Sequence, residues 1–216
     1  MSCFCVTRCE GFVEEPPPPF PQPDLKIRPE YRLFFAVNRG LRSGVADVLI
    51  GGSNWLGVGY VGGPLGLLIA AWHWRRHPER RKRDLIAIAA AAALCTVVVQ
   101  PMKFCCARER PPKAFESAVR KGELDLHIMF GAKQGRGFPS GHTATAFLIA
   151  TLVALIVGRR GAAVAALAVA SLVGVSTIYI GAHFPGDVVA GAWVGTITAL
   201  GAFRAVVLSR GGDAAA

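Results

Sequence analysis

Long apolar segments dominate this chain and decide what it can fold into. Five of them approach the 20 or so residues that a helix needs to cross about 30 Å of hydrocarbon. They comprise residues 55–74, 85–104, 142–157, 162–182 and 188–208. None shows the alternation of a half-buried strand, and their frequent Ala and Gly residues suit close helix packing in lipid. The sequence therefore predicts an all-α fold, a polytopic membrane bundle of five to six spans. The sixth depends on whether the mixed apolar and basic segment 31–54 crosses the membrane or lies at its surface.

The charge pattern agrees with a membrane protein. Of the 216 residues, 52% are hydrophobic and only 18% are charged, and the net charge is +10. A soluble domain of this length usually carries more charge. The arginines cluster at the ends of the apolar segments and no nucleic-acid-binding motif is present, so positive-inside anchoring explains the net charge and no nucleic-acid partner is expected.

The ends of the chain differ from its middle. Residues 1–30 include a proline run at 16–19 and are expected to form a disordered, extended tail without a cleaved leader. Residues 31–210 are expected to form the membrane domain, and 211–216 a second short tail. Cys3, Cys5 and Cys9 could be lipidated or bind a metal, although free thiols are commoner in such a tail. The six cysteines show no zinc-site spacing, so neither a metal nor a cofactor is expected.

Basic loops set the expected orientation. Arginines and lysines follow the first, third and fifth apolar segments, at 75–83, 159–160 and 204–210. Such clusters favour the cytoplasmic side. The opposite ends of the segments, together with a short insertion at 106–138 that we expect to be helical, then lie on the extracytoplasmic side of a plasma (inner) membrane. Three polar motifs fall at that side.

The first motif covers residues 103–111. Lys103 and Arg110 are seven residues apart, so both would face one point if the second span continued as a helix to Glu109. Pro111 disfavours helix at Arg110 and would end it there. Two converging cations can bind phosphate, whereas Lys103 alone would be taken for an anchor at the lipid headgroups.

The second motif, residues 139–142, opens the third apolar segment. Ser140 is a candidate N-cap, and the amide groups that follow it carry partial positive charge. Gly141 permits close approach of an anion to these amides. His142 would then stand beside the bound group as a proton donor. The alternative is an ordinary capped helix with a histidine at the interface.

The third motif covers residues 176–187 and ends at the fifth apolar segment. Pro185 suits a first helical turn, which places Asp187 near the start of the helix. Asp187 can take a hydrogen bond from one ring nitrogen of His183, leaving the other nitrogen unprotonated and nucleophilic. A simple first-turn acid is the alternative for Asp187.

In this order and with these spacings, the three motifs resemble the type 2 phosphatidic acid phosphatase and vanadium haloperoxidase superfamily over about residues 45–208. The resemblance implies metal-independent removal of phosphate, in which His183 attacks phosphorus to form a phosphohistidine. Asp187 would orient His183, and His142 would protonate the leaving oxygen. The phosphate oxygens would be held by Lys103, Arg110, Ser140 and Gly141. The soluble haloperoxidase branch fits less well than the membrane lipid phosphatase branch because of the apolar spans.

One position departs from this family. Thr177 stands where the third motif of the family has arginine, and a hydroxyl offers one neutral contact where a guanidinium offers a charged fork. Auxiliary candidates for the lost contact are Ser176, Thr177 itself and Arg136, and Arg108 or Lys133 could also supply charge. The expected function is a lipid phosphatase whose first substrate candidate is an undecaprenyl-type polyprenyl diphosphate, followed by phosphatidic acid or phosphatidylglycerol phosphate. The alternative is a membrane protein that binds phosphate or lipid with weakened catalysis. A transporter is disfavoured because the ionisable residues gather at span ends.

Overall fold

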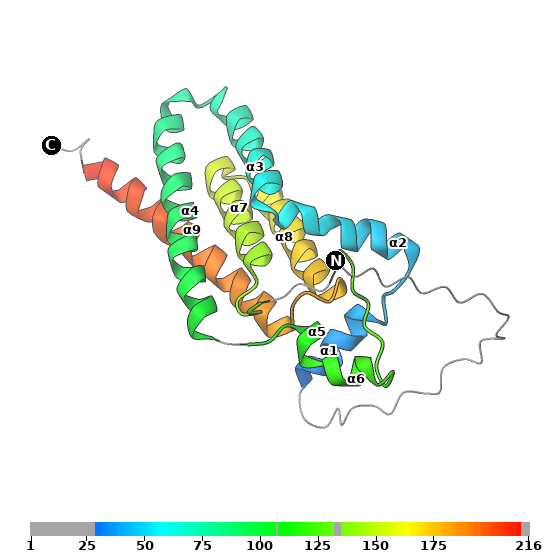
Figure 1. Cartoon of the computed structure of the whole chain (residues 1–216). Helices are drawn as coiled ribbons and strands as arrows, with labels where there is room; N and C mark the ends of the chain where they lie inside the picture. Colours follow the sequence, from blue (N-terminus) through cyan, green and yellow to red (C-terminus); the bar gives the residue numbers. More distant parts are fainter. Residues whose placement is uncertain (1–28, 107, 132–134, 213–216) are drawn as a thin grey trace, which may run out of the picture.

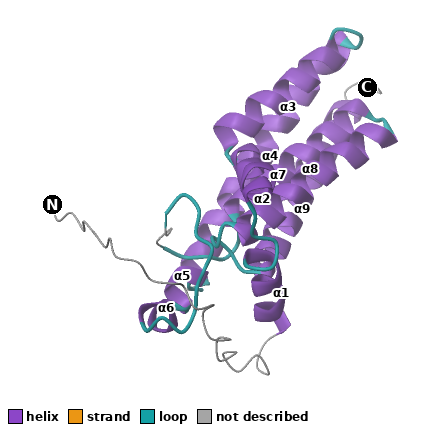
Figure 2. Cartoon of the chain, turned by 90° about the vertical axis from the view of Figure 1, so that its right-hand side faces the viewer, coloured by secondary structure: helices purple, strands orange, loops and turns teal. Residues whose placement is uncertain are grey.

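The computed structural model of the chain describes residues 29–106, 108–131 and 135–212. Outside this part lie most of the predicted N-terminal tail, residues 1–30, and residues 213–216 of the predicted C-terminal tail. The described part consists of helices and connecting loops and contains no strand, only an isolated bridge between Glu109 and Arg136; Figure 2 shows the helices and loops. The α-helices are α1 (Pro29–Asn38), α2 (Gly44–Ala46), α3 (Gly59–Trp74), α4 (Arg81–Cys105), α5 (Pro111–Ala114), α6 (Glu116–Arg120), α7 (Gly141–Val157), α8 (Arg160–Tyr179) and α9 (Pro185–Gly212). The all-α prediction is confirmed.

Helix α7 forms the centre of the bundle and packs against α3, α4, α8 and α9 (Figure 1). A helix that is apolar on all sides is typical of such a buried position. Leu148, Leu152 and Ile156 of α7 are buried in one core with Ala91 of α4 and Ala199 of α9. The small alanines on the neighbouring helices leave room for the larger side chains of α7.

Glycines of α9 set its distance from α7. A Cβ atom at Gly191 would lie 2.5 Å from the carbonyl oxygen of Ser140, and one at Gly195 would clash with the carbonyl oxygen of Ala144. The two backbones can therefore approach this closely only because both positions lack a side chain. This approach brings the beginnings of α7 and α9 together, where the second and third motifs lie.

The number of spans agrees with the prediction only in outline. Among the described residues, three helical segments are long and apolar enough to cross a membrane: Pro78–Cys105, Arg160–Tyr179 and Pro185–Ser209. A fourth span is possible if the pair Gly44–Gly57 and Gly59–Trp74 counts as one, although the two halves meet at 79°. The extended backbone of Val58 breaks this pair. Helix α7 is apolar but has only 17 residues, because Gly158 ends it in the left-handed conformation.

The insertion is helical as predicted and sits with α1 at one end of the bundle, beyond the lower end of α4 in Figure 1. Helices α5 and α6 form it together with the loop that leads to α7. Phe34 of α1 is fully buried and packs against Phe115 of the insertion and Phe184 of the α8–α9 loop. This aromatic cluster joins α1 and the insertion to the loop that carries His183.

Candidate active site

Backbone and side-chain contacts bring the three motifs together at one end of the bundle. The N–H of Ser140, in the second motif, donates to the carbonyl oxygen of Asp187 in the third at 2.9 Å. Lys103 of the first motif places its Nζ 3.3 Å from where a Cβ of Gly141 would lie. Arg110 reaches the ring of His183. Residues more than 70 positions apart in the chain therefore share one site.

A helix-ending turn carries His183. Gly181 follows the last turn of α8 with a φ of 73°, in the left-handed region that glycine adopts easily. The N–H of Ala182 donates to Thr177 O at 3.0 Å, and that of Gly181 to Ile178 O at 3.0 Å, which is the Schellman arrangement. His183 N also donates to Thr177 O, at 3.1 Å. The turn fixes the backbone of His183, and only 2% of the residue surface is exposed.

The contact between Arg110 and His183 defines the proton positions on the imidazole. Arg110 Nη1 lies 3.2 Å from His183 Nε2 and also donates to Ala182 O at 3.1 Å. A guanidinium has donors only, so Nε2 must offer its lone pair. The ring proton of the neutral imidazole is then on Nδ1, which faces Asp187 Oδ2 at 3.6 Å. The tautomer that a phosphorus-attacking Nε2 requires is therefore the one this arrangement favours.

Asp187 is fully buried beside His183. Its Oδ2 accepts a hydrogen bond from the N–H of Phe184 at 3.0 Å, and its Oδ1 lies 3.1 Å from Arg108 Nη1. The 3.6 Å to His183 Nδ1 exceeds a hydrogen bond, and such contacts in substrate-free sites are often long and shorten in the complex. The carboxylate is thus held next to the histidine by a hydrogen bond at Oδ2 and by the charge of Arg108 at Oδ1, which accepts no hydrogen bond.

Burial lowers the pKa of His183, because it disfavours the charged imidazolium. The Asp187 carboxylate opposes this and raises the pKa, whereas the charges of Arg110 and Lys103 lower it further. His183 is therefore neutral at pH 7 and retains its nucleophilic lone pair. Burial also lowers the pKa of Arg110, and Asp187 raises it; an arginine stays protonated in any case.

Ser140 is the N-cap of α7, as predicted. Its Oγ accepts from the N–H of Thr143 at 3.4 Å and from Thr143 Oγ1 at 3.0 Å. Because both contacts use lone pairs of the hydroxyl, its own proton can still be donated to an anion. Gly141 and His142 begin the helix directly after it, where the amide groups carry partial positive charge.

A groove leads from these polar groups along the bundle. It has a volume of about 280 Å³ and is lined at its polar end by Lys103, Gly141 and His142. Further along it is lined by side chains of α4 and α7, among them Val99 and Ala144. One end of the groove can thus take an anion, and the rest, where Thr96, Gln100 and Thr145 also lie, offers both apolar and polar contacts.

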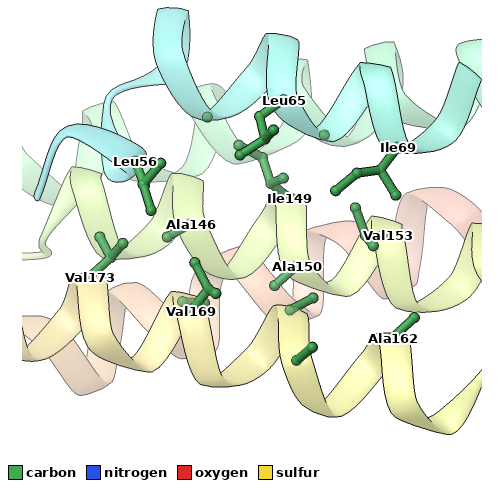
Figure 3. A pocket seen from close by; sticks show the side chains of 15 residues that line it. Leu56, Leu65, Ile69, Ala146, Ile149, Ala150, Val153, Ala162, Val169 and Val173 are labelled. Atoms are coloured by element: carbon green, nitrogen blue, oxygen red, sulfur yellow. The ribbon is translucent and has the colours of Figure 1, made fainter. Parts of the chain in front are cut away.

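A second groove, of about 300 Å³, has a different character. It lies between α3, α7 and α8, and Figure 3 shows Leu56, Ile149 and Val173 among the apolar side chains that line it. It offers no group for acid–base or nucleophilic chemistry. The first groove, which Lys103 and His142 line, is therefore the candidate substrate groove, although His183 and Arg110 are not among its lining residues.

The predicted geometry of the first motif is wrong. Helix α4 ends at Cys105, and Cys106 is extended, so no continuous helix reaches Glu109. Arg110 is also extended, with φ −78° and ψ 157°, and serves as the N-cap of the short helix α5. The proline at 111 excludes helix at Arg110 as expected, but Lys103 and Arg110 converge through a loop and not along one helix face.

The auxiliary candidates point elsewhere. Ser176 Oγ donates to Val173 O at 2.7 Å, and Thr177 Oγ1 to Gly174 O at 2.8 Å, within their own helix. The guanidinium of Arg136 donates to Lys103 O at 3.2 Å and to the neighbouring carbonyl of Phe104. Lys133 lies outside the described residues.

The sequence indicated Arg108 only as a possible replacement charge and did not indicate Glu30, which lies at the border of the predicted tail. Among the described residues, no three His, Cys, Asp or Glu side chains are grouped to hold a metal ion.

Comparison with known proteins agrees with this geometry. The family model of the PAP2 superfamily matches residues 84–210. This chain belongs to the PAP2 superfamily. The fold is similar to that of Aquifex aeolicus LpxE, with a TM-score of 0.66 and 31% identity over 81% of this chain and 94% of that one. A PAP2-type phosphatidylglycerolphosphate phosphatase from Bacillus subtilis shares the fold, with a TM-score of 0.58 at 22% identity, covering 85% of this chain and 84% of that one.

One curated relative matches a shorter stretch. A lipid A 1-phosphatase of Porphyromonas gingivalis is 48% identical over 62 residues, which are 28% of this chain and only 14% of that protein. Together with the spanning helices, these similarities confirm the predicted membrane lipid phosphatase branch and an integral membrane protein.

Proposed function

We propose that this PAP2 protein is a lipid phosphatase that works through a phosphohistidine and without a metal ion. The observation that carries the proposal is the buried His183, whose Nε2 accepts from Arg110 while its Nδ1 faces Asp187. A bound phosphate would take over the donors of Arg110 and leave the Nε2 lone pair directed at phosphorus. Such an arrangement prepares the nucleophile before the substrate binds.

The reaction then runs in two displacements. His183 Nε2 forms a bond to phosphorus while the bond from phosphorus to the leaving oxygen breaks, and His142 gives a proton to that oxygen. The leaving oxygen is the alcohol oxygen of a lipid monophosphate or the bridging oxygen of a lipid diphosphate. Water, deprotonated by His142, next attacks phosphorus, the P–N bond breaks and inorganic phosphate leaves. Lys103, Arg110, the Ser140 hydroxyl and the Gly141 amide stabilise the charge that develops on the phosphate oxygens.

The groove supports a lipid as the substrate, because its polar end continues between α4 and α7, where Val99 and Ala144 offer apolar contacts beside the more polar Thr96 and Gln100. Polyprenyl diphosphate is our first candidate, followed by phosphatidic acid and phosphatidylglycerol phosphate. The name of one relative, a lipid A 1-phosphatase, adds a phosphorylated lipid A as a further candidate. The positive-inside pattern of the basic loops supports a site on the extracytoplasmic side of a plasma (inner) membrane.

A binding protein with weakened catalysis is the second candidate. Thr177 favours it, because this residue is buried and its hydroxyl is bonded to Gly174 O. At the position where the family has arginine, the side chain of Thr177 then donates no hydrogen bond to the phosphate. Catalysis would then depend on whether Lys103 and Arg110 alone stabilise the phosphate charge enough for turnover.

A substrate panel tests the proposal. Purified protein in detergent is given each of the four lipids with and without EDTA, and free phosphate is measured. We expect turnover of at least one lipid that EDTA leaves unchanged, an acid-labile phosphoenzyme, and loss of both in His183→Ala. The matched control is His77→Ala, a half-exposed histidine of the α3–α4 connection. Turnover that persists in His183→Ala would refute the nucleophile, and binding of these lipids without any turnover would establish the second candidate.

A further inference from the structure

One face of α1 lies along the loop that carries His183. Glu30, Phe34 and Asn38 are spaced by four residues and so share a helix face. Glu30 Oε1 accepts from the N–H of Gly186 at 2.8 Å, and the ring of Phe34 packs against Phe184 with centroids 5.3 Å apart. Every residue of this stripe therefore touches the catalytic loop or its immediate support.

The last residue of the stripe holds the start of the loop. Asn38 is fully buried and donates to Tyr179 O and to His127 O, each at 2.8 Å. Its Oδ1 accepts from the N–H of His127 at 3.0 Å. The stripe thus fixes both ends of the segment between α8 and α9, although α1 precedes the region of residues 84–210 that the family model matches.

Arg108 connects this stripe to the Asp187 carboxylate. Its Nη2 lies 2.6 Å from Glu30 Oε2, and its Nη1 lies 3.1 Å from Asp187 Oδ1. The guanidinium also stacks over the ring of Phe184, 4.9 Å from the ring centre. A planar fork that bridges two carboxylates and rests on an aromatic ring has little freedom to rotate.

This bridge has a consequence for Asp187. A buried carboxylate needs a compensating charge, and Arg108 supplies it at Oδ1. With Oδ1 held there, Oδ2 stays toward the N–H of Phe184 and the Nδ1 of His183. Glu30 in turn holds Arg108, whose charge would otherwise be free to turn toward water or toward a bound phosphate.

We propose that Glu30 and Arg108 are positioning residues that fix the Asp187 carboxylate against His183, with α1 serving as a brace of the catalytic loop. The proposal rests on the phosphatase function proposed above. Arg108 could instead act as the phosphate clamp that Thr177 fails to provide. Both ends of its guanidinium are occupied by carboxylates, which favours positioning, and the two roles give different kinetics.

Steady-state kinetics with the best lipid of the panel separate these roles. We expect Arg108→Gln to lower kcat by about 10- to 100-fold, because the buried Asp187 carboxylate loses the charge that pairs with it. KM and the inhibition constant of inorganic phosphate should stay within about twofold, because no contact to the phosphate is lost. Arg108→Lys, which keeps the charge, should recover part of kcat.

Glu30 provides the sharper test, because an acid does not bind phosphate. Glu30→Gln keeps an acceptor for the N–H of Gly186 but loses the charge that holds Arg108, so we expect kcat to fall about three- to tenfold. The double variant with Arg108→Gln should be no slower than Arg108→Gln alone, because the two residues act through one contact. Glu116→Gln, which removes an exposed ion pair with Arg120, is the matched control.

Three results would overturn the proposal: a Glu30→Gln protein with the kcat of the wild type, additive effects in the double variant, or an Arg108→Gln protein in which phosphate inhibition weakens tenfold while kcat is kept. Hydrogen exchange of residues 181–187 gives a readout that does not need turnover. Glu30→Ala should raise exchange there and Glu116→Ala should not. Unchanged exchange in Glu30→Ala would refute the brace. If exchange rises in Glu30→Ala but the wild-type protein turns over none of the lipids, the brace stands and only the phosphatase function is refuted.

Discussion

Ser140 and Asp187 are joined by a 2.9 Å hydrogen bond from the N–H of the first to the carbonyl oxygen of the second. The bond places the N-terminal turns of α7 and α9 side by side. Ser140 caps one of these helices, and Asp187 lies in the first turn of the other. The positive end of α7 therefore lies beside Lys103, an arrangement suited to a phosphate, whereas the first amide groups of α9 already donate to Glu30 and to Phe184 O.

The buried state of His183 predicts an unusual acid limb of the pH–rate profile. Because burial lowers its pKa, His183 should stay neutral as the pH falls through the ordinary value of about 6.5. Activity should then be retained at that pH and lost only below it. Asp187→Asn removes a group that raises the pKa of His183, so the limb should move to still lower pH while kcat falls. Profiles of kcat/KM for both proteins check this; a limb above 6.5 in the wild type would contradict it.

The hydroxyl of Thr177 should matter little for catalysis. It donates to Gly174 O at 2.8 Å, a bond within its own helix whose loss changes the free energy of unfolding by about 1 kcal/mol. Thr177→Val keeps the shape of the side chain, so kcat and KM should stay within about twofold of the wild type. A tenfold rise in KM would show instead that the hydroxyl turns to the phosphate when the substrate binds.

The sequence predicted the elements of the site better than their geometry. Ser140 as an N-cap and Asp187 in a first helical turn follow from local residue preferences, which depend only on near neighbours. The convergence of Lys103 and Arg110 was predicted for a helical reason that proved wrong, because the break at Cys106 has no local signal such as proline or glycine.

Long-range contacts were the part that the sequence could not show. Glu30 stands directly after a proline-rich tail, and its partners Arg108 and Gly186 lie 78 and 156 residues away. Nothing in the residues around Glu30 marks such pairing. Thr177 is similar: its carbonyl holds the turn of His183, a role of the backbone that no side-chain pattern reveals.

Gly141 tests the phosphate cradle. A Cβ atom at this position would lie 3.3 Å from Lys103 Nζ, and the flexible lysine can move aside, so Gly141→Ala should fold. The added methyl group occupies space that an anion needs next to the amides of α7. We expect KM and the inhibition constant of inorganic phosphate to rise by about tenfold, the effect of 1.4 kcal/mol. Equal phosphate inhibition in both proteins would place the anion elsewhere.

Gly195 tests the packing that brings the two helix beginnings together. Its missing side chain lets α9 approach α7, since a Cβ there would lie 2.9 Å from the N of Leu148 and would clash with the carbonyl oxygen of Ala144. Both are backbone atoms of α7, so Gly195→Ala must push the helices apart, at a cost of about 1–3 kcal/mol.

The matched control is Gly201→Ala in the same helix, where nothing lies within 4 Å of the added Cβ. That change should be neutral or should stabilise the helix by up to about 1 kcal/mol. The midpoint of thermal unfolding in detergent should therefore fall for Gly195→Ala and not for Gly201→Ala, and kcat should fall with it, because the displacement also separates Ser140 from Asp187. Equal midpoints for the two variants would mean that α7 and α9 are not packed this closely.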